Sequence, residues 1–302
     1  METLETLSSR IETTEEIGSI VRTMKAVSAV SIRQYEHAVS ALKDYRRTIE
    51  LGLQVVLRGE RTEIRRRRKK GGRTAAIVFG SDRGLCGGFN RGVVDLATKE
   101  LADIEARASL ESPLIVAVGA RAAPRLESVG LPPMDVFFLP GSVAGLTKTA
   151  QSILILADRW REEEGIEQIR IFANRRTAHV LAEPIARTLW PIPTSYLRGL
   201  AERSWPTRQL PTFTMAPEKL LSWLIRQHLF VTVYHVGAQS LASEHASRLA
   251  NMQTAERNIA ERLDELSAAY RRTRQDAITS ELMDIVAGAE AMCEKEAGET
   301  LF

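Results

Sequence analysis

The sequence predicts an α/β fold in which the two ends of the chain form a long antiparallel two-helix coiled coil around a small central domain. All 11 prolines lie from Pro113 to Pro217, which leaves both ends free to form uninterrupted helices. Between the ends, short β-rich runs alternate with segments of helical spacing. We expect a coiled-coil helix over 1–60, a basic loop over 61–73, an α/β domain over 74–200, a loop over 201–217 and a second coiled-coil helix over 218–302.

The N-terminal segment carries an apolar stripe with alternating spacings of three and four residues, which is the pattern of a coiled-coil seam. Its apolar members are Leu4, Leu7, Ile11, Val21, Ile32, Tyr35, Val39, Leu42, Ile49, Leu53 and Val56, and the stripe is interrupted by Thr14, Gly18, Lys25, Ser28 and Arg46. A second stripe lies one position away and consists of Ile17, Ile20, Met24 and Val27. The seam therefore contains a slip along the predicted helix.

The C-terminal segment carries a matching stripe. Its members are Leu249, Met252, Ile259, Leu263, Leu266, Tyr270, Ala277, Leu282, Ile285, Ala289 and Met292. An apolar stripe is stable only when another surface covers it. One stripe at each end of the chain, with a compact middle, predicts an antiparallel coiled coil that stands on a globular base.

The middle of the chain has four short apolar runs that end at turn residues, and we expect each to be a strand. They span 74–82, 113–119, 136–141 and 169–175, with segments of helical spacing between them. Strands that alternate with helices form parallel sheets, so the expected domain is Rossmann-like. We also expect a further strand over 194–200.

Composition excludes several classes of protein. Two cysteines in 302 residues give no disulfide framework and favour a reducing compartment. No run of about 18 apolar residues occurs, so no membrane span is expected. The first 16 residues contain five glutamates, which argues against a signal or transit peptide. We expect a cytoplasmic protein.

The stretch FGSDRGLCGGFN, Phe79 to Asn90, permits three readings. It lacks the Lys and Ser or Thr of a phosphate-binding loop and the glycine spacing of a dinucleotide loop. Cys86 between glycines could be a hydrolase nucleophile with His179 as its base. Alternatively, the glycines permit a sharp backbone turn and Cys86 is a small buried residue.

A basic run over 64–73 contains Arg65, Arg66, Arg67, Arg68, Lys69 and Lys70. Such a run could bind nucleic acid or anionic lipid headgroups. However, the net charge of the chain is only +3, and no aromatic residues alternate with the run. A solvated loop is the simpler explanation.

Three motifs together resemble the gamma subunit, the central stalk, of F-type ATP synthases. The family's first central strand is followed by SDRGLCGG, an aromatic residue and Asn, which here are residues 81–90. The C-terminal signature is present at Arg274, Gln275, Ile278, Thr279, Glu281, Leu282, Ile285, Val286, Gly288 and Ala289. The first helix matches at Arg10, Ile11, Ile20, Met24, Lys25, Val27 and Arg33. The resemblance covers nearly the entire chain.

The resemblance implies a non-catalytic subunit that transmits torque and binds neither cofactor nor metal directly. Its implied partners are the alpha and beta subunits of the catalytic hexamer, the membrane c-ring and an epsilon-type subunit, with no nucleic acid. It implies a peripheral location on the cytoplasmic face of a bacterial inner membrane, and it places residues 201–217 at the foot of the stalk. The residues that it implies for contacts between shaft and catalytic subunits are Met24, Arg248, Arg274, Gln275 and Thr279. The residues that it implies for a structural turn are Ser81, Asp82, Arg83, Gly84, Cys86, Gly87, Gly88 and Asn90.

Some segments depart from the family pattern. The usual Thr-Gln-Lys stretch of the first helix is TEEIGSI here, the loop after that helix holds the basic run, and MCEKEAGETLF extends past the usual end. These departures indicate a divergent lineage, similar to the alternate F-type ATPases of some bacteria.

Overall fold

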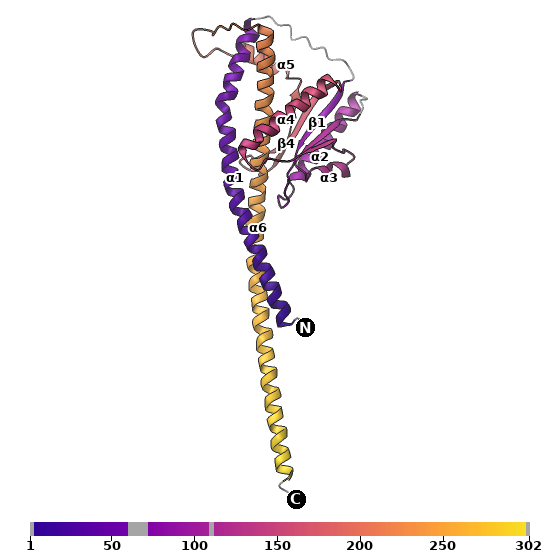
Figure 1. Ribbon diagram of the computed structural model, residues 1–302, viewed down its shortest axis with the longest axis vertical. Helices are drawn as coiled ribbons and strands as arrows, with labels where there is room; N and C mark the ends of the chain where they lie inside the picture. Colours follow the sequence, from indigo (N-terminus) through magenta and orange to yellow (C-terminus); the bar gives the residue numbers. More distant parts are fainter. Residues whose placement is uncertain (1–2, 60–71, 109–111, 300–302) are drawn as a thin grey trace. The chain divides into compact units, whose positions relative to one another are not determined.

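The computed structural model describes residues 3–59, 72–108 and 112–299 (Figure 1). The basic run at 65–70 lies outside these residues. The elements in chain order are α1 (Leu4–Gly59), β1 (Arg73–Phe79), α2 (Phe89–Ala108), β2 (Leu114–Val118), α3 (Ala123–Ser128), β3 (Asp135–Phe137), α4 (Val143–Glu162), β4 (Ile166–Arg175), β5 (Glu183–Trp190), α5 (Thr194–Glu202) and α6 (Pro217–Glu299).

The chain divides into two compact units. The terminal unit contains Met1–Ala26 and Met252–Phe302, and the central unit contains Val27–Asn251. Helices α1 and α6 contribute residues to both units.

The central unit contains a five-stranded sheet with the strand order β3-β2-β1-β4-β5. The first four strands in this order are parallel, and β5 is antiparallel to β4. The interior of β1 is buried at every position from Thr74 to Phe79. A parallel strand covered on both faces needs such a continuous apolar run, which explains why the sequence identified β1 clearly.

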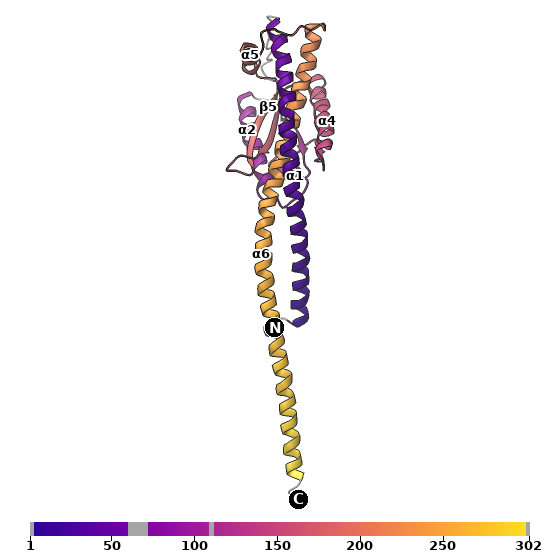
Figure 2. The ribbon, with the colours of Figure 1, turned by 90° about the vertical axis from the view of Figure 1, so that its left-hand side faces the viewer.

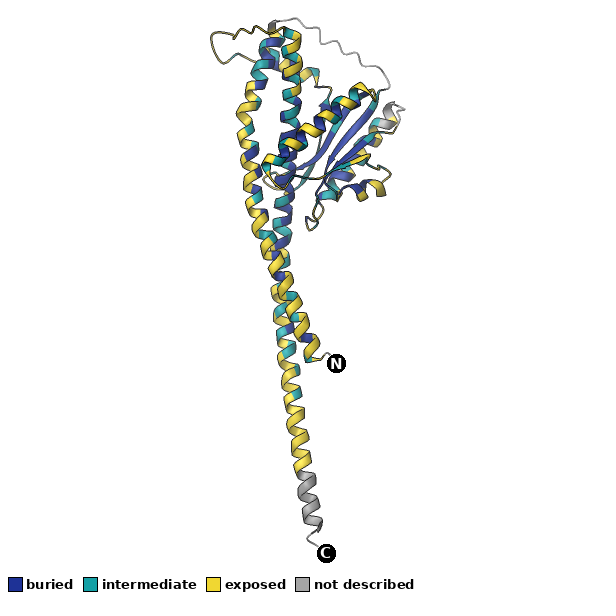
Figure 3. Ribbon diagram, in the orientation of Figure 1, coloured by how far each residue is buried: buried dark blue, intermediate teal, exposed yellow. Residues whose placement is uncertain are grey.

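Helices cover both faces of the sheet. Figure 2 shows α2 and α4 on opposite sides of it. Ala76 and Val78 of β1 pack with α2 and α3, whereas Ala75, Ile77 and Phe79 pack with α4, α1 and α6. The alternation follows from the period of two in a strand. Figure 3 shows the resulting buried strands in dark blue.

Two expectations for the middle of the chain were incomplete or wrong. β5 was not predicted, because its sequence EPIARTLW contains Pro184 and Arg187 and lacks a continuous apolar run. As an edge strand, it is largely half-buried. Residues 194–200 were expected to be a strand but lie in α5, whose buried Leu197 and Leu200 have helical i,i+3 spacing.

Within the central unit, α1 and α6 run antiparallel. The ring of Tyr35 stacks on that of His245, and the hydroxyl of Tyr45 donates a hydrogen bond of 2.9 Å to Oε1 of Gln227. Gly52 lies against Leu224. Residues later in α1 therefore contact residues earlier in α6, which is the arrangement of two antiparallel helices.

The two helices are also antiparallel within the terminal unit. Nζ of Lys25 lies 2.5 Å from Oε2 of Glu256, and a Cβ added at Gly18 would lie 3.4 Å from Ile259. Leu7 and Val21 of the first predicted stripe are buried here, as are Met252 and Leu266 of α6. Three members of the second stripe are exposed, since Ile17, Ile20 and Val27 are 48%, 59% and 49% exposed, whereas Met24 is half-buried.

Candidate functional site

The glycine-rich turn connects β1 to α2 and is closed by the amide of Asn90. Its Oδ1 accepts a hydrogen bond of 2.9 Å from the backbone N–H of Ser81, and its Nδ2 donates one of 2.8 Å to the Ser81 hydroxyl. That hydroxyl in turn donates to the carbonyl of Arg83 at 2.9 Å. The first and last residues of the SDRGLCGGFN motif therefore hold each other in place.

Asp82 connects the turn to the neighbouring strands. Its Oδ1 accepts a hydrogen bond of 2.8 Å from the backbone N–H of Ala120, just after β2. Its Oδ2 accepts one of 2.7 Å from the N–H of Leu139, just after β3. One carboxylate thus satisfies backbone donors at the carboxyl ends of two strands.

Only some of the glycines are required by backbone geometry. Gly87 has a φ of 61°, and a Cβ there would lie 2.9 Å from Nδ2 of Asn251. Leu85 also has a positive φ of 65°, although it is not glycine. Side chains at Gly84 and Gly88 would meet open space.

Cys86 is buried inside the turn and lacks the surroundings of a nucleophile. Its Sγ lies 3.5 Å from the Ser81 hydroxyl, 3.9 Å from the carbonyl of Arg83 and 4.0 Å from Nδ2 of Asn90. Among the residues described, no histidine is hydrogen-bonded to this thiol, and His179 is exposed on a loop. A catalytic cysteine needs a base within hydrogen-bond reach. The geometry favours the structural reading of the motif.

Arg248 of α6 binds the backbone of the turn. Its Nη2 donates to the carbonyl of Arg83 at 3.1 Å, and its Nε donates to that of Gly84 at 3.3 Å. Nη2 also pairs with Oε1 of Glu244 at 2.5 Å. The resemblance implies that Arg248 contacts catalytic subunits or stabilises that contact, and in this structure its side chain is only 4% exposed and binds the turn.

Sequence reasoning did not identify Glu244, although its position four residues before Arg248 is the spacing of a helical ion pair. Burial raises the pKa of the Glu244 carboxyl to about 7, while the charge of Arg248 opposes this rise. Burial also lowers the pKa of His245 to about 4, and the charges of Arg248 and Arg83 lower it further. Asn174 was missed too, and its Nδ2 donates to the carbonyl of Phe89 at 3.1 Å.

The other residues expected to make contacts lie in the terminal unit. Met24 is half-buried on α1, and Arg274, Gln275 and Thr279 are exposed on α6. The hydroxyl of Thr279 donates to the backbone carbonyl of Gln275 at 2.9 Å. The structure thus joins Arg248 to the turn motif, while the remaining four lie on the surfaces of the long helices.

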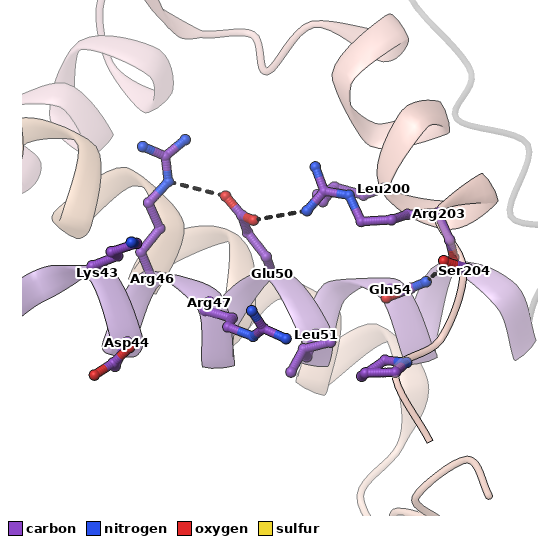
Figure 4. A pocket seen from close by; sticks show the side chains of 11 residues that line it. Lys43, Asp44, Arg46, Arg47, Glu50, Leu51, Gln54, Leu200, Arg203 and Ser204 are labelled. Atoms are coloured by element: carbon purple, nitrogen blue, oxygen red, sulfur yellow. Dashed lines mark hydrogen bonds and ion pairs between the residues drawn. The ribbon is translucent and has the colours of Figure 1, made fainter. Parts of the chain in front are cut away.

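A cavity of about 630 Å³, whose lining residues are mostly charged, lies beside α1 and the end of α5. Figure 4 shows Glu50 between Arg46 and Arg203, whose nitrogens lie 3.0 and 3.3 Å from its carboxylate oxygens. The hydroxyl of Tyr196 donates to Glu50 at 2.9 Å. Burial alone would raise the pKa of Glu50, but the hydrogen bonds from Tyr196 and Arg46 outweigh it, so this pKa lies below its usual value.

No cluster of three or more potential metal ligands occurs in the described ranges 3–59, 72–108 and 112–299. Within the same ranges, no helix combines the length and apolar character that crossing a bilayer requires.

The fold and the turn define a class of protein: an antiparallel pair of terminal helices with an inserted α/β domain, in which the most distinctive motif is architectural. A family model described as ATP synthase matches residues 3–292. The gamma chain from Bdellovibrio bacteriovorus is 26% identical, with 97% of this chain and 99% of that one covered. The gamma chain from Nostoc sp. is 28% identical, with 97% and 100% covered.

Solved structures share the fold. A chain of the rotor of the Euglena gracilis mitochondrial ATP synthase gives a TM-score of 0.61 at 15% identity and covers 91% of this chain and 98% of that one. A chain from the structure of the central stalk and c-ring of the Tetrahymena thermophila mitochondrial ATP synthase gives a TM-score of 0.55 at 16% identity and covers 78% of this chain and 99% of that one. The chain belongs to the ATP synthase family, as a gamma-type central-stalk subunit that is not itself catalytic.

Proposed function

We propose that the chain transmits torque between a membrane rotor ring driven by ion flow and a catalytic hexamer of alpha and beta subunits. The observation that carries this proposal is the exposed apolar surface of α6 near its C-terminal end. Large apolar side chains there are 48–68% exposed, namely Ile278, Leu282, Met283, Ile285 and Val286. Ile278, Leu282, Ile285 and Val286 share one helical face. An exposed apolar stripe is typical of a surface that contacts another protein.

Such a helix could change the state of surrounding subunits without bond chemistry. A rotating surface that is not symmetric presents a different face to each catalytic site in turn. Each face favours one conformation of the subunit that it contacts, because a ligand shifts an equilibrium by its differential affinity for the two states. Rotation therefore couples shaft angle to nucleotide affinity.

The contact residues have separate proposed roles. Arg274 and Gln275 form contacts that depend on the rotation angle of the shaft. Their donors can bind loop carbonyls or carboxylates of a catalytic subunit at one angle and release them at the next. Thr279 lies one turn beyond Gln275 and belongs to the same contact. Met24 provides a half-buried apolar contact on α1. Arg248 supports these contacts indirectly by holding the turn.

The foot of the stalk is proposed to contact the c-ring and an epsilon-type subunit. Residues 201–217, between α5 and α6, belong to this region. Lys43 and Arg47 are exposed beside it on α1 and line the cavity of Figure 4. Exposed cations favour an acidic partner surface and increase its rate of association.

The same role implies peripheral attachment to the cytoplasmic face of a bacterial inner membrane through the complex. We expect no directly bound cofactor and no nucleic-acid partner. Identities of 26% and 28% to the gamma chains support placement in a divergent lineage.

Co-purification tests the assembly. The tagged chain is extracted from membranes in mild detergent, and recovery of alpha, beta and ring subunits with ATP hydrolysis supports the proposal. Recovery of the chain alone, with no such subunits, would contradict it.

Variants of the assembled complex test the proposed contacts of Arg274 and Gln275. Arg274→Ala and Gln275→Ala each remove a charge-assisted or polar contact, so ATP hydrolysis and ATP-driven ion pumping should fall by up to about tenfold. Arg257→Ala is the matched control, because Arg257 is also exposed on α6 and its Nη2 donates a hydrogen bond to the hydroxyl of Thr254 one turn away. Rates equal to the control in both variants would refute the assignment.

A further inference from the structure

A second cavity, of about 380 Å³, lies in the central unit and shares Arg46 with the cluster of Figure 4. Its wall includes Arg46 of α1, Arg187 of β5, Tyr196 of α5, and His228 and His235 of α6. Its volume lies in the range of small-molecule sites, about 300–1,000 Å³. Residues of α1, of the neighbouring elements β5 and α5, and of α6 supply the wall, so the cavity is built by the tertiary fold.

Arg187 is a half-buried cation in this wall. Within the part of the chain that the structure describes, its guanidinium forms neither an ion pair nor a hydrogen bond. Burial lowers the pKa of Arg187, and the charges of Arg46 and Arg175 lower it further. An anion that enters the cavity would stabilise the charged form of Arg187, because a buried charge without a partner is costly.

Arg46 leaves donors for a ligand. Its Nε donates to Oε1 of Glu50 at 3.0 Å, and Figure 4 shows its two terminal nitrogens pointing away from that carboxylate. Glu50 also accepts from Arg203 and Tyr196. The Glu50 carboxylate is therefore shared among three donors. The residues that line the cavity include Arg46 and Arg187 and none of them is acidic, so the wall keeps an excess of positive charge.

The remaining wall adds neutral donors. Burial lowers the pKa of His228, and burial with the charges of Arg187 and Arg46 lowers that of His235 to about 4. Both imidazoles are uncharged at neutral pH, so each offers one N–H. The seven-residue spacing places them on one face of α6. Pro193 also lines the cavity at the start of α5, where a helix carries partial positive charge.

We propose that this cavity binds a small phosphate-bearing anion, either inorganic phosphate or the phosphate of a nucleotide. The planar guanidinium groups of Arg46 and Arg187 match the oxygens of phosphate, and the imidazoles complete its hydrogen bonds. The anion also removes the repulsion between the two cations. Binding is a property of the chain itself and does not depend on the torque function.

Histidine NMR of the full chain tests this proposal. The chain is labelled with ¹³C-histidine, and inorganic phosphate is titrated at pH 7 and constant ionic strength. We expect saturable shifts for His228 and His235, whereas His37 and His179, which are exposed and do not line the cavity, should not respond. Arg187→Gln should weaken binding by about tenfold or more, because a charge-assisted hydrogen-bond donor is lost.

Arg198→Gln is the matched control, since Arg198 is an exposed residue of α5 outside the cavity wall. Arg187→Lys keeps the charge but not the planar fork, so it should bind with intermediate affinity even if Arg187→Gln fails to fold. Shifts with AMP at lower concentration than phosphate identify a nucleotide as the source, and shifts with phosphate alone identify free phosphate. No saturation, equal responses of Arg187→Gln and Arg198→Gln, or equal shifts with acetate would overturn the proposal.

Discussion

The pairing of Arg248 with Glu244 makes a quantitative prediction for Arg248→Ala. The two side chains are only 4% and 6% exposed, and their charged atoms lie 2.5 Å apart. Removal of one partner from a buried pair costs about 3–5 kcal/mol, because the other group is left buried without its partner and must stay charged or take up a proton. The carbonyls of Arg83 and Gly84 also lose their donor. We therefore expect the free energy of unfolding to fall by about 3–5 kcal/mol.

Urea unfolding of the full chain, followed by tryptophan fluorescence, measures this loss. Trp160 is 1% exposed in the core of the central unit and reports on its unfolding. The double variant Arg248→Ala with Glu244→Gln removes the orphaned carboxylate. Its loss of unfolding free energy should be smaller, by about 1–3 kcal/mol, than the sum of the losses in the two single variants.

Arg257→Ala on the exposed surface of α6 is the control and should change stability by less than about 0.5 kcal/mol. A loss for Arg248→Ala below about 1 kcal/mol, within the range of exposed ion pairs, would refute the reasoning. If Arg248 acted only by contacting a partner, the variant would keep its stability and lose ATP hydrolysis in the complex.

The remaining predictions concern the turn, two glycines and acid sensitivity. Asp82→Ala should destabilise the chain by about 2–4 kcal/mol in urea unfolding, since two backbone donors lose a charged acceptor, and Asp82→Asn by about half as much. Gly18→Ala should stabilise α1 by about 0.5–1 kcal/mol because a Cβ has room there, whereas Gly52→Ala should destabilise it because a Cβ would lie 2.9 Å from Leu224. The pKa of His245 is lowered to about 4, so its contribution to stability is complete above pH 6.5 and is lost as the pH falls towards 4. His245→Gln should lack this part of the pH dependence, and an unchanged pH profile would contradict the assignment. Cys86→Ala should leave ATP hydrolysis by the complex unchanged, and a loss without destabilisation would revive the catalytic reading.

Much of the fold could be predicted because its signals are local. The absence of proline from both ends permits two long helices, and the heptad-like stripes indicate that they pair. The continuous apolar run of β1 identifies a strand covered on both faces. The SDRGLCGGFN motif could be identified from sequence, because the hydrogen bonds that close it join residues of the motif itself, at most nine positions apart.

Tertiary structure alone decided features that depend on distant neighbours. Two apolar stripes on α1 are visible in the sequence, and the position of α6 determined that Leu7 and Val21 are buried while Ile17 and Ile20 are exposed. β5 has no apolar run of its own because an edge strand is covered on fewer sides, so only its pairing with β4 defines it. Arg248 looks like a surface residue in the sequence, because burial of a charge depends on partners supplied elsewhere in the chain. The cavity around Arg187 likewise exists only where α1, β5, α5 and α6 meet.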